Sequence, residues 1–243
     1  MEAPTKLSRL WADLREALSL PRLRIRLMAD AARDNDPFFL QCVESYYRDS
    51  VRRHPKLPLI RNREYGIAVC VLPADHESYL RKIESSARRN IKKAQRLGYE
   101  FRRIDANEWL GDLAAILRST DTRQGKMPDH LLAGGFAPVT DPPSRTKVHD
   151  YAYFGIIKDG HCWAYATCLV AGELINIGDI YGHDAAKADG LVPLLISEIA
   201  RYALENHPTV RYFVYDKYFG ASETLRRFKT KFDFLPHRVS WSL

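Results

Sequence analysis

The chain has 243 residues, of which 46% are hydrophobic and 28% are charged, and this balance is ordinary for a globular protein with a substantial core. Its formal net charge of +7 favours an anionic partner, such as RNA, a phosphorylated carrier or a nucleotide-linked substrate. The four cysteines form no CxxC pair and have no companion histidine spacing, so we expect neither a metal site nor a disulfide framework. P-loop, Rossmann, HExxH and nucleophile-elbow motifs are missing, which argues against kinases, dehydrogenases, metalloproteases and hydrolases.

The N-terminal part is predicted to be mainly helical. Residues 5–19 have the spacing of a short amphipathic helix, and the charges within it exclude a signal peptide or a membrane-spanning segment. A capping Asp36 followed by Pro37 predicts the start of a second helix, which ends before Pro55. A cytoplasmic protein is the simplest expectation.

An apolar run at residues 65–72 predicts a buried strand. We therefore divide the chain into residues 1–74, an N-terminal helical extension that ends in a strand and packs on the core, and residues 75–243, the core domain. No internal repeat or low-complexity tract interrupts this division.

The core domain begins with a basic segment that is predicted to be one helix over residues 75–97, ended by Gly98. Nine Lys or Arg residues stand against two Glu between residues 81 and 103. Like charges four residues apart repel one another, which favours an anionic partner such as tRNA at Arg88, Arg89 and Lys92. The alternative is a solvated helix face.

The remaining elements alternate strands and helices. Short glycine-bearing turns join three of the strands, so these form an antiparallel meander. In chain order we expect a strand at 99–104, a helix at 109–120, a long loop, strands at 151–158, 162–170 and 174–181, a helix at 191–206, a strand at 210–215, a helix at 221–230 and a strand at 234–241.

Residues 174–206 form a strand, a glycine-containing loop and a helix. Backbone N–H groups at a helix N-terminus bind anions, so Lys187, Gly190 and the N–H of Leu191 are the expected phosphate contacts for a donor. Many α/β proteins use the same connection without binding anything there.

This order of elements resembles the GNAT acyltransferase fold, which implies a mixed, mostly antiparallel twisted sheet flanked by helices, here with an N-terminal helical extension. Two stretches narrow the resemblance. SSARRNIKKAQRLGYEFR (85–102) is similar to the Ser-x-x-Arg-x-x-Ile-x-Lys-Ala-x-x-x-Gly pattern ahead of a GNAT domain in Fem-type proteins. YFGASETLRRFKTKFDFLP (218–236) resembles their closing stretch. Fem-type enzymes transfer an aminoacyl group from aminoacyl-tRNA to an amine.

The sequence departs from these families in three places. The acetyl-CoA signature of ordinary GNAT proteins is poorly met by AAKADGLV, which slightly favours aminoacyl-tRNA over acyl-CoA as the donor. Ala221 replaces the usual Arg after Phe-Gly, and Asp233 replaces the Gly before the last strand. The chain also carries one such domain where cell-wall Fem enzymes carry two.

Transfer to an amine requires a neutral nucleophile, a stabilised oxyanion and a proton for the leaving group. Asp179 is the best candidate for a general base or amine-binding carboxylate, and Asp216 on the neighbouring parallel strand can meet it where the two strands separate. Tyr181 is a candidate proton donor. Lys229 matches the family lysine near the reacting ester. Loop-capping aspartates, a core tyrosine and a surface lysine are the alternatives.

We therefore expect a GNAT-like, Fem-like N-acyltransferase that requires no bound cofactor or metal and uses aminoacyl-tRNA or acyl-CoA as co-substrate. Its acceptor would be an amine on a small molecule or peptide. An acyl-CoA-dependent N-acetyltransferase is the first alternative, and a non-catalytic RNA- or nucleotide-binding module is the second.

Overall fold

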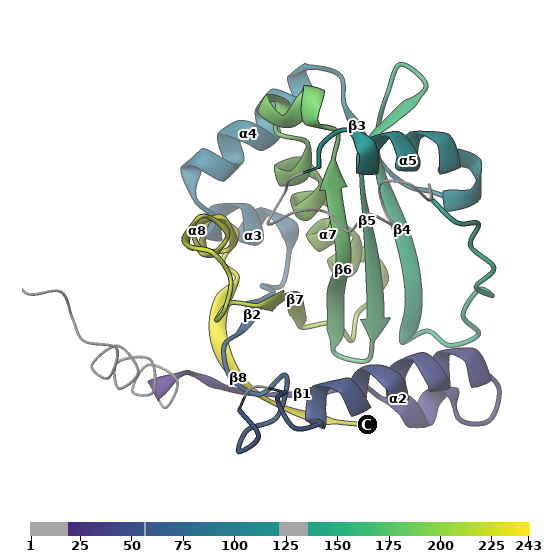
Figure 1. Cartoon of the computed structure of the whole chain (residues 1–243), viewed down its shortest axis with the longest axis vertical. Coiled ribbons are helices and arrows are strands. Elements are labelled where there is room, and N and C mark those ends of the chain that lie inside the picture. Colours follow the sequence, from purple (N-terminus) through teal and green to yellow (C-terminus); the bar gives the residue numbers. More distant parts are fainter. Residues whose placement is uncertain (1–18, 56, 122–135) are drawn as a thin grey trace, which may run out of the picture.

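The computed structural model describes residues 19–55, 57–121 and 136–243. The predicted helix at 5–19 lies outside these ranges except for its last residue. One eight-stranded sheet runs through the molecule in the order β1-β8-β2-β7-β6-β5-β4-β3 (Figure 1). Its strands are β1 (Arg22–Arg26), β2 (Ile67–Val71), β3 (Glu100–Arg103), β4 (His149–Lys158), β5 (His161–Ala171), β6 (Leu174–Gly182), β7 (Tyr212–Lys217) and β8 (Leu235–Ser242).

The β1–β8 and β6–β7 pairs are parallel, and the other pairs are antiparallel. This confirms the expected mixed, mostly antiparallel sheet. The helices that flank it are α2 (Pro37–Val51), α3 (His76–Lys82), α4 (Ser85–Arg96), α5 (Leu110–Arg118), α7 (Leu191–Asn206) and α8 (Glu223–Lys231). Short 3-10 helices occupy η1 (Ala29–Ala32), η2 (Ala106–Trp109) and η3 (Asp184–Asp189).

The alternating side chains of the strands build a core on each face of the sheet. On β5, Ala166 and Cys168 pack in the cluster that contains the buried residues of α3, α4 and α7. Their neighbour Leu169 points the other way, into the cluster that α2 covers, and Tyr165 packs with α5. The second face therefore has α2 toward one end of β4, β5 and β6 and α5 toward the other (Figure 1).

Two features of the fold differ from expectation. β1, which pairs with β8 at the edge of the sheet, was not predicted from the sequence. The helix expected over 75–97 is in fact two helices, α3 and α4, separated at Ile83, whose backbone is extended. In addition, β2 lies between β7 and β8, so residues before 75 contribute strands to the same sheet as the rest.

The break between α3 and α4 is stabilised by Arg88. Its guanidinium donates to the carbonyl oxygens of Leu80 (3.0 Å) and Ile83 at the C-terminal end of α3. The last carbonyl groups of a helix have no hydrogen-bond partner within the helix. A cation at this end also interacts favourably with the negative end of the helix dipole. Glu84 then fixes the start of α4 against α8 through its ion pair with Arg227. Apolar spacing alone does not reveal this cap.

The start of α7 is packed tightly against α4. Gly190 has a φ of +87°, and a Cβ at this position would overlap the carbonyl oxygen of Asn90. Lys93 of α4 also donates to the carbonyl oxygen of Ala188, at 2.7 Å. Glycine is therefore required at position 190 by both backbone conformation and close approach.

We found no helix in the described ranges that is both long and apolar enough to cross a lipid bilayer.

A comparison of alanine substitutions at Gly98 and Gly190 separates the effect of the positive φ from the effect of the close approach to Asn90. We expect Gly98→Ala, which has a φ of +82° and open space around its Cβ, to lower the free energy of unfolding by about 1 kcal/mol. Gly190→Ala adds the overlap with Asn90 and should lower it by about 1 to 3 kcal/mol more. Urea unfolding of both variants measures the difference. Equal losses of unfolding free energy would show that the contact between α4 and this turn leaves room for a Cβ at position 190.

Candidate functional site

The site is built around the place where β6 and β7 separate, which we call the fork. The two strands pair in parallel only from Leu174 to Asn176 on β6, opposite Tyr212 to Val214 on β7. Beyond Asn176, β6 continues along β5 to Gly182, while β7 continues along β2 to Lys217. Backbone and side chains near the separation point can therefore face a ligand.

A β-bulge shapes the β6 side of the fork. Cys168 pairs with Ile177 and Ala166 pairs with Ile180, so Gly178 and Asp179 together oppose Thr167. The backbone N–H of Asp179 donates to the Thr167 hydroxyl at 2.9 Å. A Cβ on Gly178 would come within 2.7 Å of the same hydroxyl, so only glycine fits there. Bulges commonly redirect a side chain next to a functional site, and here the redirected residue is Asp179.

Asp179 has the properties of a proton acceptor. Burial raises the pKa of its carboxyl group, and the opposing influence is the hydrogen bond from the Tyr181 hydroxyl, which is long at 3.4 Å. No lysine or arginine of the described residues forms an ion pair with it. A carboxylate that is poorly compensated in this way takes up a proton more readily than an ordinary aspartate. The structure thus places the predicted Asp179 and Tyr181 together.

A row of aromatic rings lies on the same face of the sheet as Asp179. Neighbouring ring centroids are 5.6 to 6.5 Å apart along the order Tyr151, Tyr153, Phe136, Tyr165, Tyr181. We call these five residues the aromatic row. Burial, the neighbouring Tyr151 hydroxyl and the negative charges of Asp141 and Asp179 raise the pKa of Tyr153 to about 12. Aromatic faces beside carboxylates attract cations, so this surface suits a ligand with an ammonium group.

Lys229 is almost completely buried, with 1% of its surface exposed, and is therefore not the surface lysine that was the alternative to a functional role. Its ammonium group donates to the carbonyl oxygens of Tyr215 and Lys217, both at 2.7 Å. It also lies over the Tyr215 ring, 4.7 Å from the centroid. Burial lowers its pKa to about 8. Lys229 thus holds the end of β7 on one side of the fork.

Arg63 occupies the other side of the fork, facing α2. Its guanidinium stacks on Tyr46, 5.2 Å from the ring centroid, and its Nη1 lies 3.8 Å from an Asp216 oxygen. Nη1 is buried and has no hydrogen-bond partner in the described part of the protein. The Tyr46 hydroxyl in turn donates to the side-chain oxygen of Asn176 at 3.3 Å, and Asn176 is the last residue of β6 that pairs with β7. A cationic donor is therefore available at the fork.

Asp216 does not join Asp179. It lies at the end of β7 as expected, but with a φ of +49° it faces Arg63, and the structure records no interaction between the two carboxylates. The bulge directs Asp179 toward the aromatic row on β4 and β5. The two aspartates therefore belong to different clusters, Asp179 with the aromatic row and Asp216 with Arg63.

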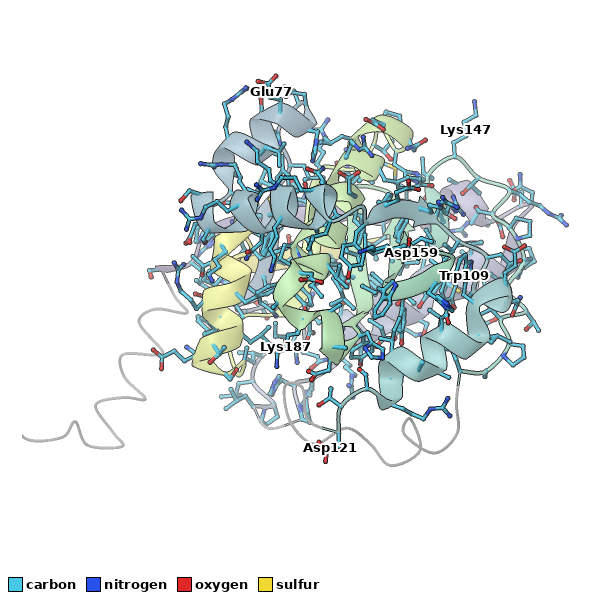
Figure 2. The ribbon with its side chains drawn as sticks, turned by 90° about the horizontal axis from the view of Figure 1, so that it is seen from above. Glu77, Trp109, Asp121, Lys147, Asp159 and Lys187 are labelled. Atoms are coloured by element: carbon cyan, nitrogen blue, oxygen red, sulfur yellow. The ribbon has the colours of Figure 1, made fainter. Side chains whose placement is uncertain are left out.

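Some of the residues expected to bind the donor stabilise the fold, and the others are exposed basic residues on the surface. Arg88 caps α3, and Gly190 and Leu191 begin α7 beneath the Asn90 carbonyl oxygen. Lys187 is exposed in η3 (Figure 2), 3.8 Å from Asp184. Arg89 and Lys92 line a shallow depression on α4 together with Gln95 and Arg96. Neither Arg89 nor Lys92 forms an ion pair within the described ranges, so both remain available to an anion.

Several residues near the fork were not predicted from the sequence. Tyr151 and Tyr153 are two apart on β4 and therefore share a face, a signal that was readable in the sequence. Arg63 and Tyr46 reach the fork only through tertiary packing. The described residues contain no group of three or more His, Cys, Asp or Glu placed to bind a metal ion.

No family model matches the chain, and no curated protein matches its sequence. Solved structures similar to it include the C-terminal DUF2156 domain of a protein named as a lysylphosphatidylglycerol synthetase from Agrobacterium fabrum, with 16% identity and a TM-score of 0.47. L-PGS from Bacillus licheniformis has 14% identity and a TM-score of 0.46. A GCN5-related N-acetyltransferase from Kribbella flavida has 13% identity and a TM-score of 0.35.

The chain spans 57% of the length of each of these structures, while 72%, 71% and 73% of the chain itself is covered, in the same order. A GNAT protein is thus among the similar structures, and the Fem-type part of the resemblance stays a prediction. Because all three TM-scores lie below 0.5, we argue function from the residues of the fork.

The buried Lys229 makes stability depend on pH in a defined direction. Its pKa is about 8 when folded and 10.5 ordinarily, so between these values the unfolded chain binds more protons and stability rises with pH. Lys229→Met loses this rise, which is at most about 1.4 kcal/mol per pH unit. Its hydrogen bonds to two carbonyls are lost as well, lowering stability at pH 7 by about 1 to 3 kcal/mol.

Unfolding free energies of the wild type and Lys229→Met between pH 7 and 10 measure this dependence. Lys231→Met on the same helix serves as the control and should track the wild type. If the difference in unfolding free energy between the wild type and Lys229→Met stays constant with pH, Lys229 does not have a lowered pKa in the folded protein.

Proposed function

We propose that the protein is an N-acyltransferase that moves an aminoacyl group from an aminoacyl-tRNA to the amino group of an acceptor. The observation that carries this proposal is the position of Asp179, a carboxylate with a raised pKa, in the β6 bulge at the fork and beside the aromatic row. The arrangement supplies a proton acceptor next to a surface that attracts ammonium groups.

In the proposed reaction, Asp179 first accepts and then returns a proton. An acceptor amine arrives largely as an ammonium ion, and Asp179 takes one proton from it. The free amine attacks the ester carbonyl carbon, forming the C–N bond. The C–O bond to the ribose then breaks, and the leaving oxygen receives the proton from Asp179, directly or through the Tyr181 hydroxyl, which lies 3.4 Å from the carboxylate. The regenerated carboxylate takes the second proton from the new amide nitrogen and releases it to water, so that the whole reaction liberates one proton. Holding amine and ester together supplies much of the rate.

The negative charge that develops on the carbonyl oxygen needs a positive partner. Arg63 offers its buried Nη1 on the α2 side of the fork. Lys229 donates to two carbonyl oxygens at the end of β7 on the α8 side, and its buried positive charge adds to the positive potential there. A fixed cation in a water-poor setting stabilises an oxyanion better than water does.

The surface around α7 favours tRNA over CoA as the donor. A pyrophosphate at the N-terminus of α7 would meet the Asn90 carbonyl oxygen, which covers Gly190 and repels anions. The unpaired Arg89 and Lys92 instead lie along the exposed face of α4, where they suit an extended phosphate backbone.

Asp179→Asn should lower kcat/KM for amide formation by about 10²- to 10⁴-fold, because asparagine cannot accept the proton. In the wild type, kcat/KM should fall as the pH drops through the raised pKa of Asp179, since only the carboxylate is active. The variant should lack this acidic limb. The assay follows radiolabelled aminoacyl-tRNA with a panel of primary amines.

Asp159→Asn, in the exposed β4–β5 turn, is the matched control and should retain wild-type kinetics. An Asp179→Asn variant with an unchanged rate and pH profile would refute the assignment of Asp179 as the base. Efficient transfer from acetyl-CoA, with none from aminoacyl-tRNA, would show that the protein is instead an acyl-CoA-dependent N-acetyltransferase.

Removal of Arg89 and Lys92 should weaken tRNA binding mainly through charge. For the double alanine variant we expect the slope of log Kd against log salt concentration to decrease by about 1.5 to 2, since each contact releases counterions. Filter binding at several salt concentrations measures it. Arg33→Ala/Arg102→Ala removes two exposed charges elsewhere and should leave the slope unchanged; equal slopes for both double variants would refute a tRNA contact on α4.

A further inference from the structure

Two leucines project from the loop that follows α2. Leu59 is 99% exposed and Leu57 is 56% exposed, which makes them the most exposed large hydrophobic residues in the described ranges. We call residues 52–61, without residue 56, the leucine loop. Figure 1 shows this part of the chain beside β1 and β8, at the end of α2. Isolated surface leucines are common, but two at one tip mark a contact surface.

The leucine loop is held in one shape by hydrogen bonds. The N–H of His54 donates to the Ile60 carbonyl oxygen at 2.9 Å, and the N–H of Leu57 donates to the His54 carbonyl oxygen at 3.2 Å. Arg53 and Arg61 face one another in a β-bridge at its base. The leucines are therefore presented to solvent by an ordered turn, and their exposure is built into the loop.

Arginines without ion pairs lie at the base of the leucine loop. Arg53 and Arg61 form no ion pair with any described residue, and Arg22 of β1 lines the same shallow depression as Arg61. The acidic residues nearby are already occupied: Asp49 pairs with Arg52 and Arg63, and Glu64 pairs with Arg238. An apolar tip on a base that carries unpaired arginines matches a bilayer surface, where hydrocarbon lies beneath anionic phosphate.

The base of the leucine loop contacts the fork directly. Asn62 accepts a hydrogen bond from the Lys217 ammonium group at 2.8 Å, and the next residue, Arg63, stacks on Tyr46 near Asp216. Whatever the loop binds is therefore joined through two residues to the end of β7. A surface bound there would set the orientation of the fork.

We propose that the leucine loop docks the protein on an anionic lipid surface, with Leu57 and Leu59 inserted among the acyl chains and Arg53, Arg61 and Arg22 on the phosphate groups. Charge complementarity and the paired leucines favour lipid over nucleic acid, which offers no apolar layer for the leucines. The contact is peripheral and reversible, and it is independent of whether the fork catalyses transfer.

Cosedimentation of the full chain with vesicles tests the proposal. We expect binding to phosphatidylcholine vesicles that contain about 30% phosphatidylglycerol, weaker binding to pure phosphatidylcholine, and release by salt. Leu57→Ser/Leu59→Ser should weaken binding at least about tenfold. Both leucines are exposed, so this variant should keep the wild-type melting temperature. Leu97→Ser/Leu243→Ser, at two exposed leucines elsewhere, should bind like the wild type.

Arg53→Gln/Arg61→Gln should reduce the preference for phosphatidylglycerol, whereas Arg33→Gln/Arg102→Gln should not. The proposal is overturned if the wild type does not bind the anionic vesicles, or if the serine variant at 57 and 59 binds as tightly as the wild type. Leucine-dependent self-association without vesicle binding, measured by sedimentation velocity, would also overturn it, because the occupant would then be a second copy of the chain.

Discussion

Parallel strands stay together only while their backbone hydrogen bonds continue, and in this protein those bonds stop after three residues. β6 then follows β5, and β7 follows β2. Each strand has its own support beyond that point: the Gly178–Thr167 bulge on β6, and the buried Lys229 beneath the carbonyl groups of β7. The chemistry that we propose depends on this separation, because beyond it neither strand covers the other, and groups such as Asp179 on β6 lie beside an opening in the sheet.

Charge is distributed unevenly around the fork. On the sheet face between α2 and α5, Asp179 and Asp141 lie beside aromatic rings, which suits an incoming ammonium group. Arginines and lysines are concentrated instead on α4 and near the leucine loop, where they can bind phosphate groups. An acceptor amine and a polyanionic donor or surface would thus approach from different sides, and neither would have to displace the other.

Local sequence patterns predicted most of the fold but only part of the site. The meander and the helix at 191–206 were predicted because their apolar spacing is regular, and Asp179 because it is a polar residue near the end of an apolar strand. β1 was missed since three arginines in RLRIR hide its buried Ile25. The break at Ile83 was missed because it depends on a cap from Arg88, and the burial of Lys229 because its sequence neighbours are basic. These features arise from packing between distant segments.

The central claim is that the reacting carbonyl group lies in the fork. A non-hydrolysable aminoacyl-adenosine 3′-amide with a photoreactive group on its aminoacyl part would test it, with the labelled peptides identified by mass spectrometry. The account predicts labelling within residues 177–182 of β6 or 215–217 of β7, reduced by an excess of the unmodified amide. Specific labelling confined to α4 or to the leucine loop, with none on β6 or β7, would contradict it.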